Sequence, residues 1–182
     1  MIPYFRKIKI PDLDVMSGEI LDNVDIIRKS DYRALTENST FYDAHVRKLL
    51  ECCPTLSAWL ADHGIRQYLE FAMFPWIAAK SQSGLHLDFP ASRAAINIPV
   101  LNCNNSFSSW HSSSTENPHN NLPFYSCVDT GIEYAQIDSK FAHWFNSEIP
   151  HKGTNLSNEP RMIMTMRFSC NIDLDKFDTY ED

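Results

Sequence analysis

In the first third of the chain, apolar residues recur at the three- and four-residue intervals of an amphipathic helix. Ser17 precedes the first run as an N-cap, Thr40 and Asp43 have capping-box spacing before the second, and Pro54 opens a third that Gly64 would end. The apolar positions are Ile20, Leu21, Val24 and Ile27; Val46, Leu49 and Leu50; and Leu56 to Leu60. Residues 1–66 are therefore predicted to be mostly helical.

From Gln67 onward the apolar period shortens to two, and aromatic and β-branched residues gather in short runs between Pro, Asn, Ser and Gly. Strands are predicted near 67–74, 76–80, 84–88, 94–100, 106–111, 123–128, 132–137, 141–150 and 161–170. Asp129-Thr130-Gly131 predicts a hairpin turn, and the Ser- and Asn-rich stretch 102–121 is expected to contain a loop. Short strands after a helical segment predict a β-sandwich or jelly roll with helices packed on one outer face.

Length and composition predict one folded domain. The 182 residues suit a single core, and 43% hydrophobic and 21% charged residues are typical of globular chains rather than disordered ones. The domain is expected to comprise a mostly helical N-terminal segment (residues 1–66), a β core over 67–170 and an acidic C-terminal tail, 171–182. Only five Gly occur, and neither GxGxxG nor GxxxxGKS/T is present, which disfavours nucleotide-binding folds.

Charge and cysteine content narrow the expected partners and surroundings. A net charge of −7 disfavours binding to nucleic acid, although a local basic patch stays possible. The five Cys include no CxxC pair, and the charged N-terminus is unlike a signal peptide. The chain also lacks an apolar stretch long enough for a membrane span. We therefore expect a protein of the reducing cytoplasm that does not associate with membranes.

The first candidate for chemistry is a His-x-Asp pair in the predicted strand 84–88. His86 and Asp88 are two residues apart, so on a strand both side chains leave the same face and can bind one metal ion. With seven His in the chain, one such pair arises by chance in about half of chains of this composition. A coincidental surface pair therefore remains an alternative.

A second feature lies near the C-terminus, where His151 follows His86 by 65 residues and a polar loop is expected to come next. The strand beyond that loop alternates strongly: Arg161, Ile163, Thr165 and Arg167 share one face, and Met162, Met164, Met166 and Phe168 share the other. The two Arg either point to solvent, where Arg161 could pair with Glu159 or the acidic tail, or line a polar cavity that holds an anion.

These ingredients fit one another chemically. Two His and one carboxylate occupy three positions of an octahedral ferrous ion and leave three open. The open positions suit a bidentate 2-oxoacid and dioxygen, and an Arg at the cavity floor would match the distal carboxylate of such a cosubstrate.

The order HxD, distal His and then Arg ten residues later resembles the Fe(II)- and 2-oxoglutarate-dependent dioxygenases. Within that superfamily, the run from His86 to Val100 and the segment 150–161 are similar to the aspartyl/asparaginyl β-hydroxylase-like branch. The resemblance covers about residues 67–170. It implies a mainly β fold with α, in which a double-stranded β-helix (a jelly-roll, cupin-like core) has the N-terminal helices packed outside.

The resemblance also implies roles for individual residues. His86, Asp88 and His151 would bind Fe(II), and Arg161 would bind the C5 carboxylate of 2-oxoglutarate. Asn97 stands where the branch places a polar cosubstrate contact, usually a His. Many members have a small residue where Ile163 stands here, so Arg167, on the same strand face, is kept as the alternative anion ligand. Arg93 is a candidate substrate contact on the loop after Asp88.

The expected activity is hydroxylation of a C–H bond in a small-molecule or amino-acid or peptide substrate, coupled to oxidation of 2-oxoglutarate by O2 to succinate and CO2. The main alternative is a non-catalytic jelly-roll binding or structural module in which HxD is coincidental. A cupin-type isomerase or metal enzyme ranks last, because such proteins usually carry an HxH pair and none occurs here. The sequence identifies neither the substrate nor the oligomeric state.

Overall fold

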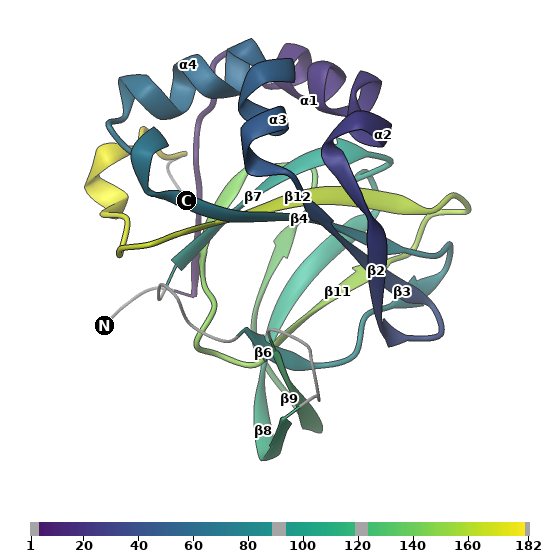
Figure 1. Cartoon of the computed structure of the whole chain (residues 1–182). Helices are drawn as coiled ribbons and strands as arrows, with labels where there is room; N and C mark the ends of the chain where they lie inside the picture. The colour runs from purple at the N-terminus through teal and green to yellow at the C-terminus, as the bar shows by residue number, and fades with distance from the viewer. Residues whose placement is uncertain (1–3, 89–93, 119–123, 181–182) are drawn as a thin grey trace.

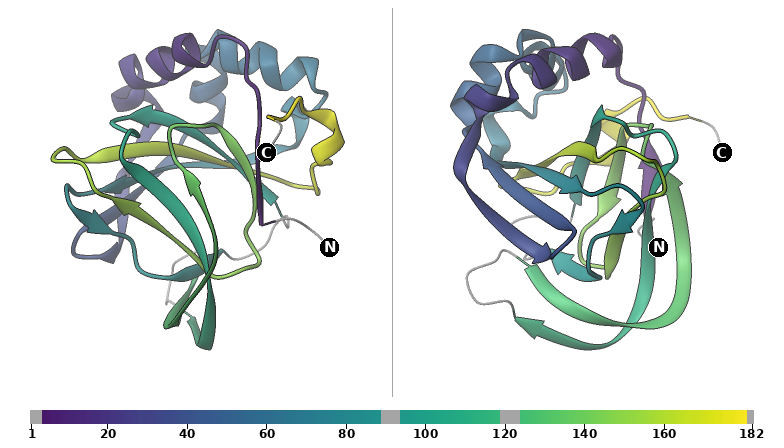
Figure 2. Two further views of the ribbon diagram at one scale, coloured as in Figure 1. Left: turned by 180° about the vertical axis from the view of Figure 1, so that it is seen from behind. Right: turned by 90° about the vertical axis from the view of Figure 1, so that its right-hand side faces the viewer.

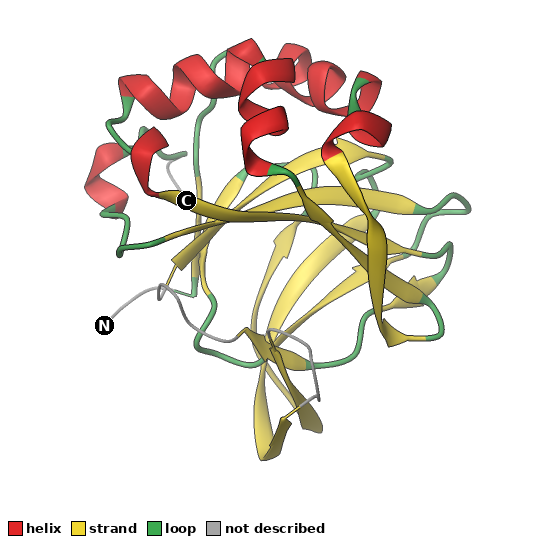
Figure 3. Cartoon of the chain, in the orientation of Figure 1, coloured by secondary structure: helices red, strands yellow, loops and turns green. Residues whose placement is uncertain are grey.

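The computed structural model describes residues 4–88, 94–118 and 124–180. Its helices are α1 (Leu13–Asp22), α2 (Val24–Ile27), α3 (Val46–Cys52) and α4 (Pro54–Asp62), with short 3-10 turns η1 (Arg66–Tyr68) and η2 (Leu174–Lys176). Its strands are β1 (Phe5–Lys7), β2 (Arg28–Thr36), β3 (Ser39–Ala44), β4 (Leu69–Ile77), β5 (Ser81–Gln82), β6 (His86–Asp88), β7 (Ala94–Leu101), β8 (Ser106–Pro118), β9 (Phe124–Asp138), β10 (His143–Asn146), β11 (His151–Asn155) and β12 (Arg161–Phe168). Strands dominate after α4 (Figure 3).

The described strands form two antiparallel sheets. One has seven strands in the order β1-β10-β7-β12-β4-β3-β2, and the other has five in the order β5-β11-β6-β9-β8, with β11 also paired to β8. The pairs are nested along the chain: β4 pairs with β12, β5 and β6 with β11, β7 with β10, and β8 with β9. This nesting is the topology of a jelly roll, so the predicted double-stranded β-helix is confirmed.

The four α-helices cover the outer face of the seven-stranded sheet (Figures 1 and 2). Fully buried helix residues such as Ile20, Leu49 and Leu60 pack with residues of β4, β7 and β12 in the main hydrophobic core. Burying one such side chain stabilises the fold by about 1.5–3 kcal/mol. This layer fixes the outer face of the sheet and leaves its inner face turned toward the second sheet.

The alternation predicted for the last strand is confirmed in β12. Met162, Met164, Met166 and Phe168 belong to the core under the helices. Arg161, Ile163 and Thr165 line a cavity on the opposite face of the sheet. Because the side-chain period of a strand is two, a single strand contributes both to the core and to the cavity.

The first 66 residues contain strands as well as the predicted helices. β2 and β3 form a hairpin that continues the seven-stranded sheet beyond β4. Thr40 therefore lies in a strand, and Ser17 lies inside α1, where its hydroxyl donates to the Pro99 carbonyl of β7 (2.7 Å) instead of capping a helix. Pairing with β4 decides the state of residues 39–44, whose aromatic and β-branched residues suit a strand. The third helix begins at Pro54 and ends before Gly64, as predicted.

The predicted hairpin turn at residues 129–131 is wrong, because this segment lies inside the long strand β9. Opposite it the register with β8 shifts, so that His111 pairs with Glu133 and Ser113 with Asp129. Gly131 has a φ of 80°, which is the backbone conformation of a bulge as well as of a tight turn. The local turn signal at residues 129–131 therefore marks an irregularity within β9 and not the end of a strand.

Two segments expected to contain loops are strand over part of their length. β8 extends from the strand predicted near 106–111 to Pro118, and β11 covers the first residues of the polar segment after His151. Residues 102–105 and 156–160 lie outside any strand, as expected of loops. Each strand gains its backbone hydrogen bonds from neighbours far away in sequence, since β11 pairs with β5, β6 and β8. The local amino-acid composition of a segment does not indicate which distant strands it will pair with.

The C-terminal segment packs on the body of the fold. Phe177 is buried and stacks on Trp59 of α4, with ring centroids 5.6 Å apart. The Trp144 indole donates to the Ile172 carbonyl (3.3 Å). Across the described ranges, no helix is both long enough and apolar enough to cross a membrane.

Candidate metal centre

Three metal-ligating side chains meet between the two sheets. His86 and Asp88 come from β6, and His151 is the first residue of β11. Antiparallel pairing places His151 directly opposite His86, and their ring centroids are 4.5 Å apart. The Nε2 atoms of His86 and His151 lie 3.8 and 3.7 Å from the two carboxylate oxygens of Asp88. All three residues are buried.

The protonation of the two imidazoles is set by the backbone. Nδ1 of His86 donates to the Gly84 carbonyl (2.8 Å), and Nδ1 of His151 donates to the Ile149 carbonyl (2.9 Å). A carbonyl only accepts, so Nδ1 of each ring carries a proton, and in the neutral form of the ring the lone pair is on Nε2, which faces Asp88. Histidine ligands of metals are usually oriented by such a second hydrogen bond.

The donor set fits a divalent cation. Two Nε2 lone pairs and a carboxylate converge, and one ligand atom from each residue lies within 4.8 Å of the others. The Nε2–carboxylate separations are too long for hydrogen bonds. Acceptors that face one another without a proton between them are stabilised by a cation, and two His with one carboxylate suit ferrous iron in particular.

The charges of the centre are consistent with metal binding at neutral pH. Burial, followed by the proximity of His151, lowers the pKa of His86 to about 4, so the ring is neutral. Burial, the largest single effect, raises the pKa of Asp88, but the Arg167 guanidinium together with the nearby His151 and His86 outweighs it and holds that pKa below its ordinary value. Nη2 of Arg167 lies 2.5 Å from Oδ1 of Asp88, and both side chains are buried. Asp88 is therefore ionised.

The ligands open onto a cavity of about 40 Å³ that Arg161 also lines. Only 1% of Arg161 is exposed, and its Nη1 donates to Ser139 Oγ (2.6 Å) and the Phe107 carbonyl (3.4 Å). Burial lowers the pKa of Arg161 to about 10, which still leaves it charged at neutral pH. Within the described residues, no carboxylate pairs with this guanidinium, and its buried Nε has no hydrogen-bond partner. An anion in the cavity would supply the missing counter-charge.

Gly153 of β11 makes room for this arginine. A Cβ at position 153 would lie 2.3 Å from Nη2 of Arg161 and 2.8 Å from Cδ1 of Ile77. The glycine backbone is held on one side by Ser83, whose Oγ accepts from the Gly153 amide (2.9 Å). The guanidinium therefore lies against bare backbone, two residues along the strand from the candidate metal ligand His151.

Asn97 of β7 also lines the cavity, next to Thr165 of β12. Oδ1 of Asn97 accepts from Thr165 Oγ1 (2.7 Å), and its Nδ2 lies 3.0 Å from Nε2 of His143 in β10. His143 is fully buried and carries no motif in the sequence. Its role depends on the β7–β10 register, in which it pairs with Asn97, so only the fold reveals it.

The structure thus brings together five of the seven residues predicted for the site: His86, Asp88, His151, Asn97 and Arg161. Arg167 lies on the same face of β12 as Arg161 but pairs with Asp88. Arg93 lies outside the described residues.

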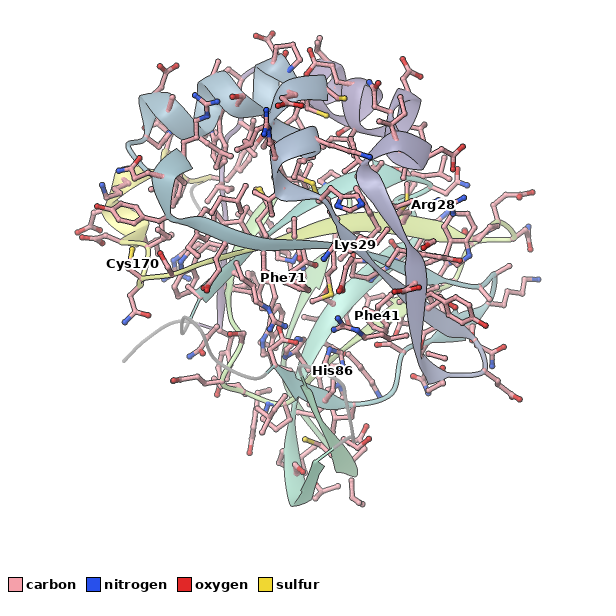
Figure 4. The ribbon with its side chains drawn as sticks, in the orientation of Figure 1. Arg28, Lys29, Phe41, Phe71, His86 and Cys170 are labelled. Carbon is pink, nitrogen blue, oxygen red and sulfur yellow. The ribbon has the colours of Figure 1, made fainter. Side chains whose placement is uncertain are left out.

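Part of the apolar lining of the cavity comes from β3 and β4. Phe41 of β3 and Met73 of β4 line it, and the Phe41 ring approaches His86 edge-on, with centroids 6.1 Å apart (Figure 4). Sequence reasoning missed Phe41 because its segment was expected to begin a helix. The consecutive β-branched and aromatic residues Thr40, Phe41 and Tyr42 were the available signal of a strand.

Comparison by sequence finds no relative: neither a protein-family model nor a curated protein matches the chain. Among solved structures, oxalate decarboxylase of Bacillus subtilis matches 78% of the chain with 6% identity and a TM-score of 0.42. Hazelnut (Corylus avellana) vicilin matches 77% with 13% identity and 0.43, and E. coli ycfD matches 78% with 15% identity and 0.44. The chain spans 28%, 31% and 36% of these proteins, respectively. At such identities and TM-scores, the matches carry no information about ligand or activity.

Proposed function

We propose that the protein is an Fe(II)- and 2-oxoglutarate-dependent dioxygenase that hydroxylates a C–H bond of a small-molecule, amino-acid or peptide substrate and releases succinate and CO2. One observation carries the proposal. A converging His86, Asp88 and His151 set shares a buried cavity with Arg161, a charged side chain for which the described residues provide no carboxylate. A cation site and an anion site in one cavity suit a metal and an anionic cosubstrate.

Each residue has a distinct task in this proposal. His86, Asp88 and His151 would hold the iron, and Arg161 would bind the distal carboxylate of 2-oxoglutarate. Arg167 keeps Asp88 ionised and holds one of its oxygens, which leaves the other turned toward His151. When bound, iron supplies the activation of O2 and the oxidation of the substrate C–H bond. The protein orients the reactants and excludes water.

The size of the cavity sets a condition on this function. A volume of about 40 Å³ holds roughly three water molecules, which is less than a five-carbon dicarboxylate needs. We therefore expect that binding of 2-oxoglutarate displaces side chains on the apolar side of the cavity. Met73 is the side chain best suited to move, because methionine is unbranched and adapts its shape to its surroundings.

The same volume favours a second candidate, a jelly-roll module that binds a metal ion without an organic cosubstrate and has no catalytic activity. As described, the cavity accommodates an ion with a few water molecules. The two candidates share the metal ligands and differ in the ligand of Arg161.

Anaerobic titration calorimetry on protein loaded with Fe(II) separates the two candidates. The dioxygenase is expected to bind 2-oxoglutarate and, once O2 is admitted, to form succinate. H86A should lose metal and turnover, and Arg161→Gln should lose 2-oxoglutarate but keep metal. The exposed Arg47→Gln variant serves as the matched control and should behave as wild type. Metal binding without 2-oxoglutarate would establish the second candidate, and absence of metal binding would refute both.

A further inference from the structure

His143 is a buried histidine that takes no part in binding the metal. It lies in β10, directly opposite Asn97 of β7, and none of its surface is exposed. Its Nδ1 lies 2.9 Å from the Phe141 carbonyl, and its Nε2 lies 3.0 Å from Nδ2 of Asn97. On its other side, Asn97 accepts a hydrogen bond from Thr165 Oγ1 (2.7 Å). The three side chains form one chain of hydrogen bonds that ends at a backbone carbonyl.

The Phe141 carbonyl sets the direction of each hydrogen bond that links His143, Asn97 and Thr165. The Phe141 oxygen only accepts, so Nδ1 of His143 carries the proton. Burial, the largest cause, lowers the pKa of His143 to about 4, so the ring is neutral and Nε2 only accepts. The nitrogen end of the Asn97 amide must therefore face His143, and its oxygen end must face Thr165. The orientation of an amide, which its shape alone leaves ambiguous, is thus set by its neighbours.

The fixed orientation of the Asn97 amide decides which hydrogen-bonding groups of His143, Asn97 and Thr165 remain for a ligand in the cavity. Asn97 and Thr165 line the cavity, whereas His143 lies behind them. The Thr165 hydroxyl proton is already donated to Asn97. Nδ2 of Asn97 carries two protons, and in the stretches of chain that the structure describes only one is donated, to His143. The second N–H of Asn97 is therefore the donor that these three side chains can present to a ligand.

We infer that His143 is a positioning residue, which holds the Asn97 amide so that one N–H donates to a carboxylate or carbonyl oxygen of the ligand in the cavity. Were the amide reversed, its oxygen would face Nε2 of His143 and two acceptors would oppose each other without a proton. A neutral His143 therefore favours an oxygen-bearing ligand beside the metal. The inference rests on the proposed function for the identity of that ligand as 2-oxoglutarate.

Variants of His143 test the inference through ligand affinity rather than turnover. In calorimetry on protein loaded with Mn(II), His143→Leu should weaken 2-oxoglutarate binding about 10–100-fold, the effect of one hydrogen bond to a charged group. Metal affinity should change less than about threefold. His143→Gln, which keeps an acceptor for Asn97, should restore most of the affinity. His63→Leu is the matched control, since Nδ1 of His63 also bonds a backbone carbonyl, that of Trp59, but away from the cavity.

A second measurement needs no ligand. In the ¹⁵N spectrum of the metal-free protein, His143 should be the Nδ1–H tautomer and should stay so from pH 8 to about pH 5, because its pKa is about 4. In Asn97→Asp, a carboxylate oxygen replaces the donor. His143 should then gain a proton on Nε2, and 2-oxoglutarate binding should fall at least as far as in His143→Leu. This variant supplies the affinity test if His143→Leu does not fold.

The outcomes for the inference and for the proposed function are distinguishable. If wild type binds 2-oxoglutarate and a folded His143→Leu binds it equally well, the positioning role is refuted while the proposed function stands. If wild type binds metal but no 2-oxoglutarate, the proposed function fails. The tautomer then decides the inference: an Nε2–H tautomer of His143 refutes it, and an Nδ1–H tautomer supports the donor orientation of Asn97.

Discussion

Replacement of Gly153 by alanine tests whether the position of Arg161 governs anion binding. The added Cβ would lie 2.3 Å from Nη2 of Arg161, whereas ordinary contacts begin near 3.4 Å, so about 1 Å must be gained. The backbone of β11 cannot easily move away, because two hydrogen bonds of 2.9 Å hold Gly153 to Ser83. The Gly153 amide donates to Ser83 Oγ, and the Ser83 amide donates to the Gly153 carbonyl. The guanidinium must therefore move, and its 2.6 Å bond to Ser139 breaks or lengthens.

The magnitude follows from this displacement. Overpacking of this kind costs about 1–3 kcal/mol of unfolding free energy. A misplacement of about 1 Å at a binding group costs on the order of 100-fold in function. We expect Gly153→Ala to weaken 2-oxoglutarate binding about 10–100-fold while metal affinity changes less than about threefold, because the three atoms nearest to the new methyl group belong to Arg161 and Ile77 and not to the metal ligands.

Urea unfolding and anaerobic calorimetry measure the two effects separately. Gly18→Ala is the matched control: it adds the same methyl group inside α1, where nothing lies within 4 Å, and should stabilise the protein by about 0.5–1 kcal/mol. Wild-type affinity for 2-oxoglutarate in a folded Gly153→Ala protein would refute the role assigned to Arg161.

Three further predictions concern the metal centre. Asp88→Asn leaves the Arg167 charge buried without its partner and should lower the unfolding free energy by about 3–5 kcal/mol in urea; a loss below about 1 kcal/mol would contradict a buried ion pair. His86 and His143 have folded pKa values of about 4 against 6.5 when unfolded, so the unfolded state binds more protons between these values. Metal-free protein should therefore lose up to about 1.4 kcal/mol per pH unit for each imidazole as pH falls from 6.5 toward 4, and a flat profile there would show that the rings are not buried neutral. Mn(II) at about 100 times its Kd should add about 2.7 kcal/mol of stability to wild type, read as a rise in Tm, and none to His151→Ala; an equal rise in both would place the ion elsewhere.

Much of the candidate site was predictable because strand periodicity is local. The two-residue spacing of His86 and Asp88 already places both side chains on one face, whatever the rest of the fold does. The alternation in β12 likewise separates Arg161 from the core-facing Met162. The number and order of the strands after the helices predicted a β-sandwich or jelly roll, and the pairing of the strands shows the jelly roll. What failed was local turn chemistry: residues 129–131 form a bulge, and Thr40 lies in a strand, because pairing with distant strands overrode local signals.

The sequence by itself determined which side chains share a face of each strand and that a metal-ligating pair and an arginine exist on such faces. Only the tertiary structure decided which faces meet. It placed His143 within hydrogen-bond distance of Asn97 and paired Arg167 with Asp88, so that Arg167 is not left to bind an anion. It also placed the Arg161 guanidinium against Gly153, where any larger residue would collide with it. The physical reason is that strand partners are chosen by packing and register between segments tens of residues apart, whereas the pattern along one strand records only its own two faces.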